Sequence, residues 1–286
     1  MGIRRPAFAG SFYPYDPEEL KKEIESCFLH KFGPGKIPSK RPSEETAPER
    51  RVLSIVVPHA GYEYSGPVAS NAYYRLAQDR RPDVVVVLGP NHQGFGSPVA
   101  LMGKGEWATP LGRVRIAEEL SQELVKSSGF IDLDEEAHRS EHSIEVQIPF
   151  LQYIYGSDFK LIPINMGFQD LETSRKIGAD IANVMKDTNV VLIASSDMSH
   201  YVPQKTAERL DRMVIDPILA LDEETLQSNV FSYRITTCGY GPVSAILVAS
   251  KQLGAKRAEL LAYKTSGDMT GDYSAVVGYS SIVIMR

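Results

Sequence analysis

Three apolar runs constrain the fold of this chain more than any other feature. They read VLSIVV at residues 52–57, VVVVL at 84–88 and VVLIA at 190–194, and none alternates strictly between apolar and polar residues. A strand with one solvated face shows that alternation, whereas a strand covered on both faces is apolar throughout. The runs therefore predict buried strands with helices on both faces of their sheet, as in an α/β protein.

Helical patterns lie between and after these runs, which predicts a sheet that is at least partly parallel. A first helix is expected to begin at Asp16-Pro17, an N-cap and first-turn pair, and to run to about Phe28. Shorter apolar segments predict additional strands and make the sheet mixed. The other predicted helices are 66–78, 115–127, 141–155, 171–186, 204–220 and 241–253, and the additional strands are 98–102, 160–164, 258–264 and 274–284.

The length of 286 residues is compatible with one α/β domain, and we expect a single domain over residues 1–286. One segment interrupts the pattern. Residues 33–51 include four prolines and many charged side chains without periodicity. This composition predicts a flexible surface loop.

Composition also excludes several classes of partner. The formal net charge of −5 argues against nucleic acid and anionic membranes, which recruit an excess of Lys and Arg. No apolar run approaches the ~20 residues that span a bilayer, and the N-terminus lacks the apolar region of a signal peptide. The two cysteines are too few for a disulfide framework and fit a reducing compartment. We therefore expect a cytoplasmic protein with no nucleic-acid or membrane partner.

Each of the three buried runs is followed by a polar loop that contains histidine. His59 follows the first run, His92 follows the second, and Asp197 and His200 follow the third. In open α/β sheets, ligands bind at the carboxyl ends of the strands, where segments distant in sequence converge. One such histidine would be interpreted as structural, but three at equivalent positions predict a shared site.

Cys238 is the candidate for a fourth element of this site. It lies in TTCGYGP, just before an apolar helical pattern, where a helix N-terminus would favour the thiolate. With His59 and His92 it forms a ligand set suited to Fe(II), Cu or Zn, and three protein ligands leave a coordination position open. The alternative for Cys238 is a structural role as a small buried apolar side chain. We interpret Cys27 in that way.

His200 is a candidate acid/base, because an unperturbed imidazole titrates near neutral pH and Asp197, three residues earlier, could orient it. The segment AHRSEHSIEV offers further groups. Its residues His138 to His142 match the inverted zincin motif H-x-x-E-H, but such a short match often arises by chance. We expect instead that Glu141 and His142 face the crevice as acid/base or hydrogen-bonding groups; a solvated helix face is the alternative.

Trp107, in GEWATPLG, belongs either to a rim or lid over the crevice or to a buried structural anchor. Four tyrosines near the predicted strand ends either line a binding crevice or pack as ordinary wall residues. They are Tyr62, Tyr64, Tyr201 and Tyr240.

The motifs RRPAFAGSFYPYDPEEL, VPHAGYEYSGPVA, GPNHQGFG, EWATPLG, EHSIEVQIPFL, SSDMSHY and TTCGYGP occur in this order and resemble the Memo family over nearly the whole chain. That family is similar in fold to class III extradiol ring-cleaving dioxygenases, which implies a mixed sheet flanked by helices and a non-haem metal at the strand ends. The resemblance implies the metal ligands His59, His92 and Cys238, with His200 at the place of the acid/base histidine and Asp197, Glu141 and His142 in the pocket.

By this resemblance, the chain differs from the dioxygenases in one ligand, because Cys238 matches the position of their carboxylate ligand. A thiolate there changes both the charge and the redox chemistry of a bound metal. For partners, the resemblance implies phosphotyrosine peptides and receptor-tyrosine-kinase signalling in animals, and AMMECR1-type or radical-SAM proteins in microbes.

Three hypotheses follow. The leading one is a metal-dependent redox or dioxygenase-like enzyme of unknown substrate, holding Fe(II) or Cu, with Zn as a third option. The second is a metal-free enzyme with Cys238 as nucleophile, His200 or His142 as base, and Asp197 or Glu141 orienting that base. The third is a non-catalytic module that binds a small molecule or a (phospho)peptide in the same crevice.

Overall fold

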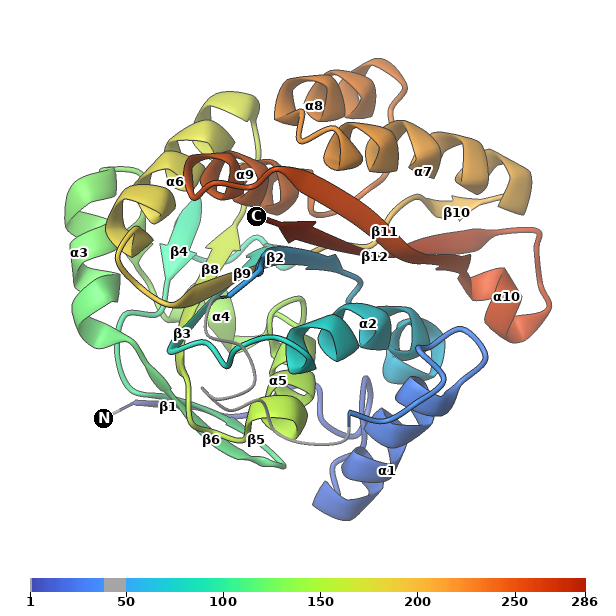
Figure 1. Ribbon diagram of the computed structural model, residues 1–286, viewed down its shortest axis with the longest axis horizontal. Coiled ribbons are helices and arrows are strands. Elements are labelled where there is room, and N and C mark those ends of the chain that lie inside the picture. Colours follow the sequence, from blue (N-terminus) through green and yellow to red (C-terminus); the bar gives the residue numbers. More distant parts are fainter. Residues whose placement is uncertain (1, 39–49) are drawn as a thin grey trace.

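The three apolar runs form adjacent parallel strands at the centre of a mixed sheet. The computed structural model describes residues 2–38 and 50–286 (Figure 1). In it, β9 (Val190–Ser195) lies between β3 (Val84–Pro90) and β2 (Val52–Val57) and is parallel to both. Every residue of these strands is buried, as predicted for strands covered on both faces.

The rest of the sheet combines parallel and antiparallel pairs, so the predicted mixed topology is confirmed. The main strand order is β1-β5-β6-β8-β3-β9-β2-β12-β10, with β11 paired to β12, and β4 paired to β7 and β8. The remaining strands are β1 (Ile3–Arg4), β4 (Val99–Leu101), β5 (Glu106–Thr109), β6 (Gly112–Ile116), β7 (Asp132–Leu133), β8 (Lys160–Met166), β10 (His200–Val202), β11 (Arg257–Thr265) and β12 (Val276–Met285).

Helices cover both faces of the sheet (Figure 1). Buried residues of α1, α2 and α5 join one apolar cluster with Ile55, Val85 and Ile193, whereas α3, α6, α7, α8 and α9 join the other with Val56 and Val86. The helices are α1 (Pro17–Leu29), α2 (Tyr62–Ala77), α3 (Glu118–Ser128), α4 (Glu136–Arg139), α5 (Ile148–Tyr155), α6 (Leu171–Met185), α7 (Gln204–Leu219), α8 (Glu223–Ser232), α9 (Tyr240–Gln252) and α10 (Ser266–Thr270), with a 3₁₀ turn, η1, at Glu145–Gln147.

Local sequence signals explain several helix boundaries. Asp16 caps α1 as predicted, because its carboxylate accepts hydrogen bonds from the N–H groups of Glu18 and Glu19. The helix predicted at 66–78 begins earlier, at Tyr62. Within the part of the chain that the structure describes, no helix is both long and apolar enough to cross a membrane.

The predicted helix at 141–155 is wrong in its first half. Glu141 folds back, and its carboxylate accepts hydrogen bonds from the backbone N–H groups of His142 and Ser143. These side-chain bonds give the backbone N–H groups an alternative to the hydrogen bonds of a helix. Regular helix starts only at Ile148, followed by Pro149, which is tolerated in a first turn.

Two further predictions have different outcomes. Trp107 lies in β5 with 1% of its surface exposed, and the guanidinium of Arg4 lies 4.5 Å from its ring centroid. The rim or lid interpretation is therefore wrong, and the buried anchor is confirmed. The predicted flexible loop at 33–51 falls largely on residues 39–49, which lie outside the described residues, although the adjacent Arg50 is buried.

A buried ion pair fastens the N-terminal segment to the chain beside the strand ends. Arg4 pairs with the fully buried Glu145, and it also donates to the backbone carbonyl of Glu141 at 2.9 Å. Glu145 accepts hydrogen bonds from the N–H of Phe8 at 2.8 Å and the hydroxyl of Tyr13 at 2.6 Å. These contacts fix the N-terminal segment relative to the loop that carries Glu141.

We expect Glu145→Ala to lower the free energy of unfolding by about 3–5 kcal/mol, because the variant leaves the Arg4 charge buried and unpaired. Asp158→Ala is the matched control. Its partner Arg81 is an exposed side chain at 3.3 Å, so the loss should stay below about 1 kcal/mol. Denaturant unfolding measures both variants, and equal losses would contradict the structural role of the buried pair.

Candidate metal centre

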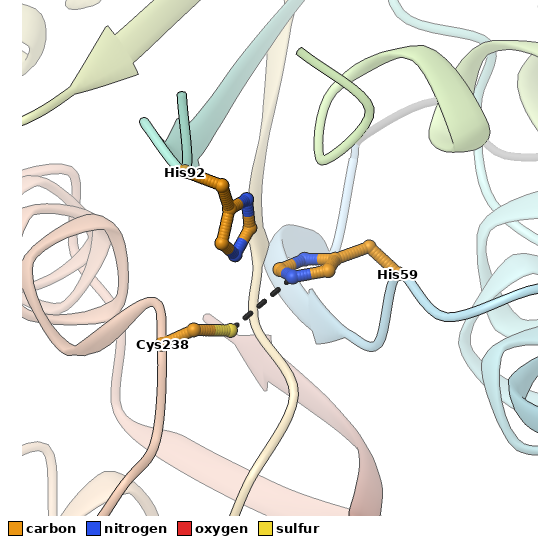
Figure 2. A group of neighbouring side chains, drawn as sticks. All are labelled: His59, His92 and Cys238. Atoms are coloured by element: carbon orange, nitrogen blue, oxygen red, sulfur yellow. Dashed lines mark hydrogen bonds between the residues drawn. The ribbon is translucent and has the colours of Figure 1, made fainter. Parts of the chain in front are cut away.

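The carboxyl ends of the parallel strands bring His59, His92 and Cys238 together. His59 lies two residues after β2, His92 two residues after β3, and Cys238 in the loop before α9. Figure 2 shows the three side chains pointing toward one another. One ligand atom from each lies within 4.8 Å of the other two, and His59 Nε2 is 3.2 Å from Cys238 Sγ. The predicted convergence of these three residues is confirmed.

His59 is oriented by a buried hydroxyl. Its Nδ1 lies 2.9 Å from Ser195 Oγ, which leaves Nε2 facing Cys238. Burial, and then the neighbouring imidazoles, hold the pKa of His59 well below its usual value. The ring is therefore neutral at physiological pH, and neutral imidazole is the form that binds metals.

His92 is oriented by a buried carboxylate instead. Glu141 accepts hydrogen bonds from His92 Nδ1 at 2.9 Å and from the His92 backbone N–H at 2.7 Å. Burial opposes the charge on Glu141, but the hydrogen bond from His92 and the electrostatic interactions with His92 and His142 outweigh it and lower the pKa of Glu141 to about 2. A carboxylate that holds the outer nitrogen of a ligand histidine is a common arrangement around metals.

Cys238 differs from the sequence-based expectation in its protonation. Burial, and then the nearby Asp197, raise the pKa of its thiol well above the usual range. The predicted helix effect is outweighed by this desolvation, because α9 begins only at Tyr240. In the metal-free protein Cys238 is therefore a thiol. This finding counts against the hypothesis of a metal-free nucleophile.

His142 adds a third imidazole to the centre. Its ring stacks on that of His92 with centroids 4.6 Å apart, and its centroid lies 5.3 Å from that of His59. Burial is the main reason that its pKa is lowered to about 4. His92, Glu141 and His142 also form a second group whose ligand atoms lie within 4.8 Å of one another. As predicted, Glu141 and His142 face inward rather than lying on a solvated helix face.

Asp197 and His200 both lie at the site but do not form the predicted pair. Asp197 accepts a hydrogen bond from the backbone N–H of His59 at 2.8 Å, and burial raises its pKa to about 6. His200 Nδ1 lies 2.8 Å from the carbonyl oxygen of Thr236. Thr236, rather than Asp197, therefore orients His200, because a carbonyl can only accept and so fixes the proton on Nδ1.

A cavity of about 410 Å³ opens beside these side chains. Of the two alternatives for the tyrosines, Tyr201 follows the first and lines the cavity, whereas Tyr62 is buried in the core, where its hydroxyl donates to the carbonyl of Val146. Sequence reasoning missed Phe12 and Tyr279, since neither stands directly after an apolar run. The lining residues are Phe12, His59, Ala60, Gly61, His92, His142, Asp197, His200, Tyr201, Val277 and Tyr279.

The inverted zincin interpretation of His138 to His142 is wrong. Helix α4 ends at Arg139, so the two histidines do not lie on one helical face. His138 is buried against Trp107, with ring centroids 5.7 Å apart, and its Nε2 lies 3.2 Å from the carbonyl oxygen of Ala100. It belongs to the packing around the N-terminal segment.

Comparison with known proteins identifies the family of this chain. A family model described as Memo-like protein matches residues 4–283. The chain belongs to the Memo family. The MEMO1 family protein of Methanopyrus kandleri is 50% identical over 285 residues, covering 99% of each chain. That of Methanothermobacter thermautotrophicus is 47% identical over 282 residues, covering 98% of this chain and 99% of the relative.

A solved structure supports the fold at a greater distance. The uncharacterized protein JW3007 from Escherichia coli K12 matches with a TM-score of 0.56 at 15% identity, covering 82% of this chain and 100% of that chain. The likeness concerns the fold alone. Family membership and the α/β architecture predicted from sequence are thus confirmed.

The raised thiol pKa predicts slow chemistry at Cys238. In metal-free protein at pH 7.5, we expect iodoacetamide to alkylate Cys238 much more slowly than a thiol in an unstructured peptide, because the thiolate is the reacting form. Mass spectrometry of time points measures the rate. Rapid alkylation confined to Cys238 would contradict the protonated state and revive the nucleophile hypothesis.

Proposed function

We propose that this protein is a metal-dependent redox enzyme of the dioxygenase-like type, with Fe(II) or Cu held by His59, His92 and Cys238 and with a substrate that remains to be identified. The observation that carries the proposal is the meeting of two imidazole nitrogens and one sulfur, with both imidazoles lining the cavity. A cytoplasmic location fits the use of a free cysteine as a ligand.

The donor set fits such a metal. Each histidine uses Nδ1 for a protein hydrogen bond and keeps Nε2 for the centre. Nitrogen and sulfur donors suit Fe, Cu and Zn and do not suit Mg²⁺ or Ca²⁺. Bonds of about 2.0–2.3 Å to one ion require only small side-chain movements from the present separations.

A metal bound there would supply redox chemistry and a position for dioxygen or substrate. The chain supplies the surroundings. Because the proton of His200 is fixed on Nδ1 by Thr236, its Nε2 can accept a proton from a substrate in the cavity that it lines. Asp197, with its raised pKa of about 6, is a second group that can exchange a proton near neutral pH.

The phosphopeptide alternative has less support. Phosphotyrosine recognition relies on clustered arginines, and none of the described residues that line the cavity is Arg or Lys. The aromatic rings of Phe12, Tyr201 and Tyr279 favour a small organic substrate instead. Association with AMMECR1-type or radical-SAM proteins stays a prediction from the family.

Metal analysis of protein purified without oxygen tests the proposal. We expect about one Fe, Cu or Zn per chain in the wild type and a loss of most of it in Cys238→Ala and His92→Ala, since each variant removes one of three ligands. Cys27→Ala is the control, because Cys27 is buried in the core away from the site. Full metal retention in Cys238→Ala would refute the ligand assignment.

Metal affinity should also depend on pH. Because binding replaces the proton of the Cys238 thiol, we expect the apparent affinity to rise about tenfold per pH unit from pH 7 to 9. Competition with a chelator, using Co²⁺ as a coloured probe, measures the slope. Cys238→Ala should bind weakly with a flat profile. A flat profile in the wild type would mean that no proton is displaced.

A further inference from the structure

A buried hydrogen-bond network behind His59 has a direction that can be worked out group by group. It joins Tyr73 on α2, Gln147 in η1, Ser195 at the end of β9, and His59. Each of these side chains is at most 2% exposed. Buried polar groups make the hydrogen bonds available to them, so donors and acceptors must match throughout the network.

The amide of Gln147 comes first. One of the two terminal atoms of the amide lies 2.9 Å from the carbonyl oxygen of Pro58. Because a carbonyl oxygen can only accept, that terminal atom is the donor Nε2. The other terminal atom is therefore Oε1, which accepts a hydrogen bond from the hydroxyl of Tyr73 at 2.6 Å. The second hydrogen of Nε2 then points at Ser195 Oγ, 2.8 Å away.

Ser195 is therefore left with a single possible role toward His59. Its only hydroxyl hydrogen goes to the carbonyl oxygen of Ser143 at 2.6 Å. The oxygen already accepts from Gln147, and its remaining lone pair faces His59 Nδ1 at 2.9 Å. Because this oxygen has no hydrogen left to donate, the hydrogen of that last bond must come from the imidazole.

We infer that Ser195, held by Gln147 and the Ser143 carbonyl, is a positioning residue that forces neutral His59 to carry its proton on Nδ1. The lone pair of Nε2 is then directed at Cys238. A carboxylate such as Glu141 beside His92 is an acceptor by nature, whereas a hydroxyl can donate or accept. The network removes that freedom from Ser195. The assignment of the tautomer is independent of the proposed function. Only the effect of the tautomer on metal affinity rests on the proposed function.

Nitrogen NMR of metal-free protein with ¹⁵N-labelled histidine tests the tautomer directly at pH 7.5. We expect His59 to show a protonated Nδ1 and an unprotonated Nε2 in the wild type. In Ser195→Ala, Nδ1 loses its acceptor, and the proton should move wholly or partly to Nε2, where Cys238 Sγ can accept it. Ser195→Thr, which keeps the hydroxyl, should restore the wild-type spectrum.

Metal affinity provides the second measurement. We expect the Kd for Zn²⁺ or Co²⁺ to rise about 10- to 100-fold in Ser195→Ala and to recover in Ser195→Thr. Ser281→Ala is the matched control. Ser281 is also fully buried, and its hydroxyl makes no hydrogen bond among the described residues, so both the tautomer and the Kd should be unchanged.

The outcomes separate the two proposals. A wild-type His59 protonated on Nε2 overturns the inference without the need for any variant, and so does a Ser195→Ala spectrum identical to the wild type. If the tautomer shifts as expected but no protein binds metal, the role of Ser195 is supported and the proposed function fails. A shift in the tautomer together with the rise in Kd supports both.

Discussion

The parallel pairing of β2, β9 and β3 is the constraint on which the rest of the structure depends. Strands that run in one direction end at one edge of the sheet, so the loops after them meet although the last residues of β2, β3 and β9, which are Val57, Pro90 and Ser195, lie far apart in the chain. Each strand is fully buried, which fixes its register between two layers of helices. The site is thereby attached to strands that are buried on both faces.

The ligand side chains are held by groups of different chemistry. His92 is held by the carboxylate of Glu141, His59 by the hydroxyl of Ser195, and Cys238 accepts a hydrogen bond from the N–H of Asp197 at 3.3 Å. Burial strengthens these bonds and also disfavours the charged thiolate. In the metal-free site the imidazole of His59 and the thiol of Cys238 are thus both neutral, and a metal cation must replace the thiol proton to bind the sulfur. Such a centre favours metals that bind thiolate strongly.

Much of the site followed from sequence because its signals are local. Uninterrupted apolar runs identify buried strands, and a histidine just after such a run is visible in the sequence itself. The missed features depend on contacts between distant segments. Thr236 displaced Asp197 as the partner of His200, Glu141 broke the predicted helix by bonding its own neighbours, and burial outweighed the helix effect at Cys238. The composition of the chain and the spacing of its motifs do not indicate which of these competing interactions is stronger.

X-ray absorption spectroscopy of the metal-loaded protein tests the shared centre most directly, because it counts sulfur and nitrogen atoms around the ion without reference to activity. Two histidines and one cysteine predict one sulfur at about 2.3 Å and nitrogen scatterers at about 2.0–2.1 Å, the distances typical of zinc sites. A spectrum with no sulfur in the coordination shell would contradict the assignment of Cys238. The fold and the family assignment would stand after such a result, but the proposed metal centre would not.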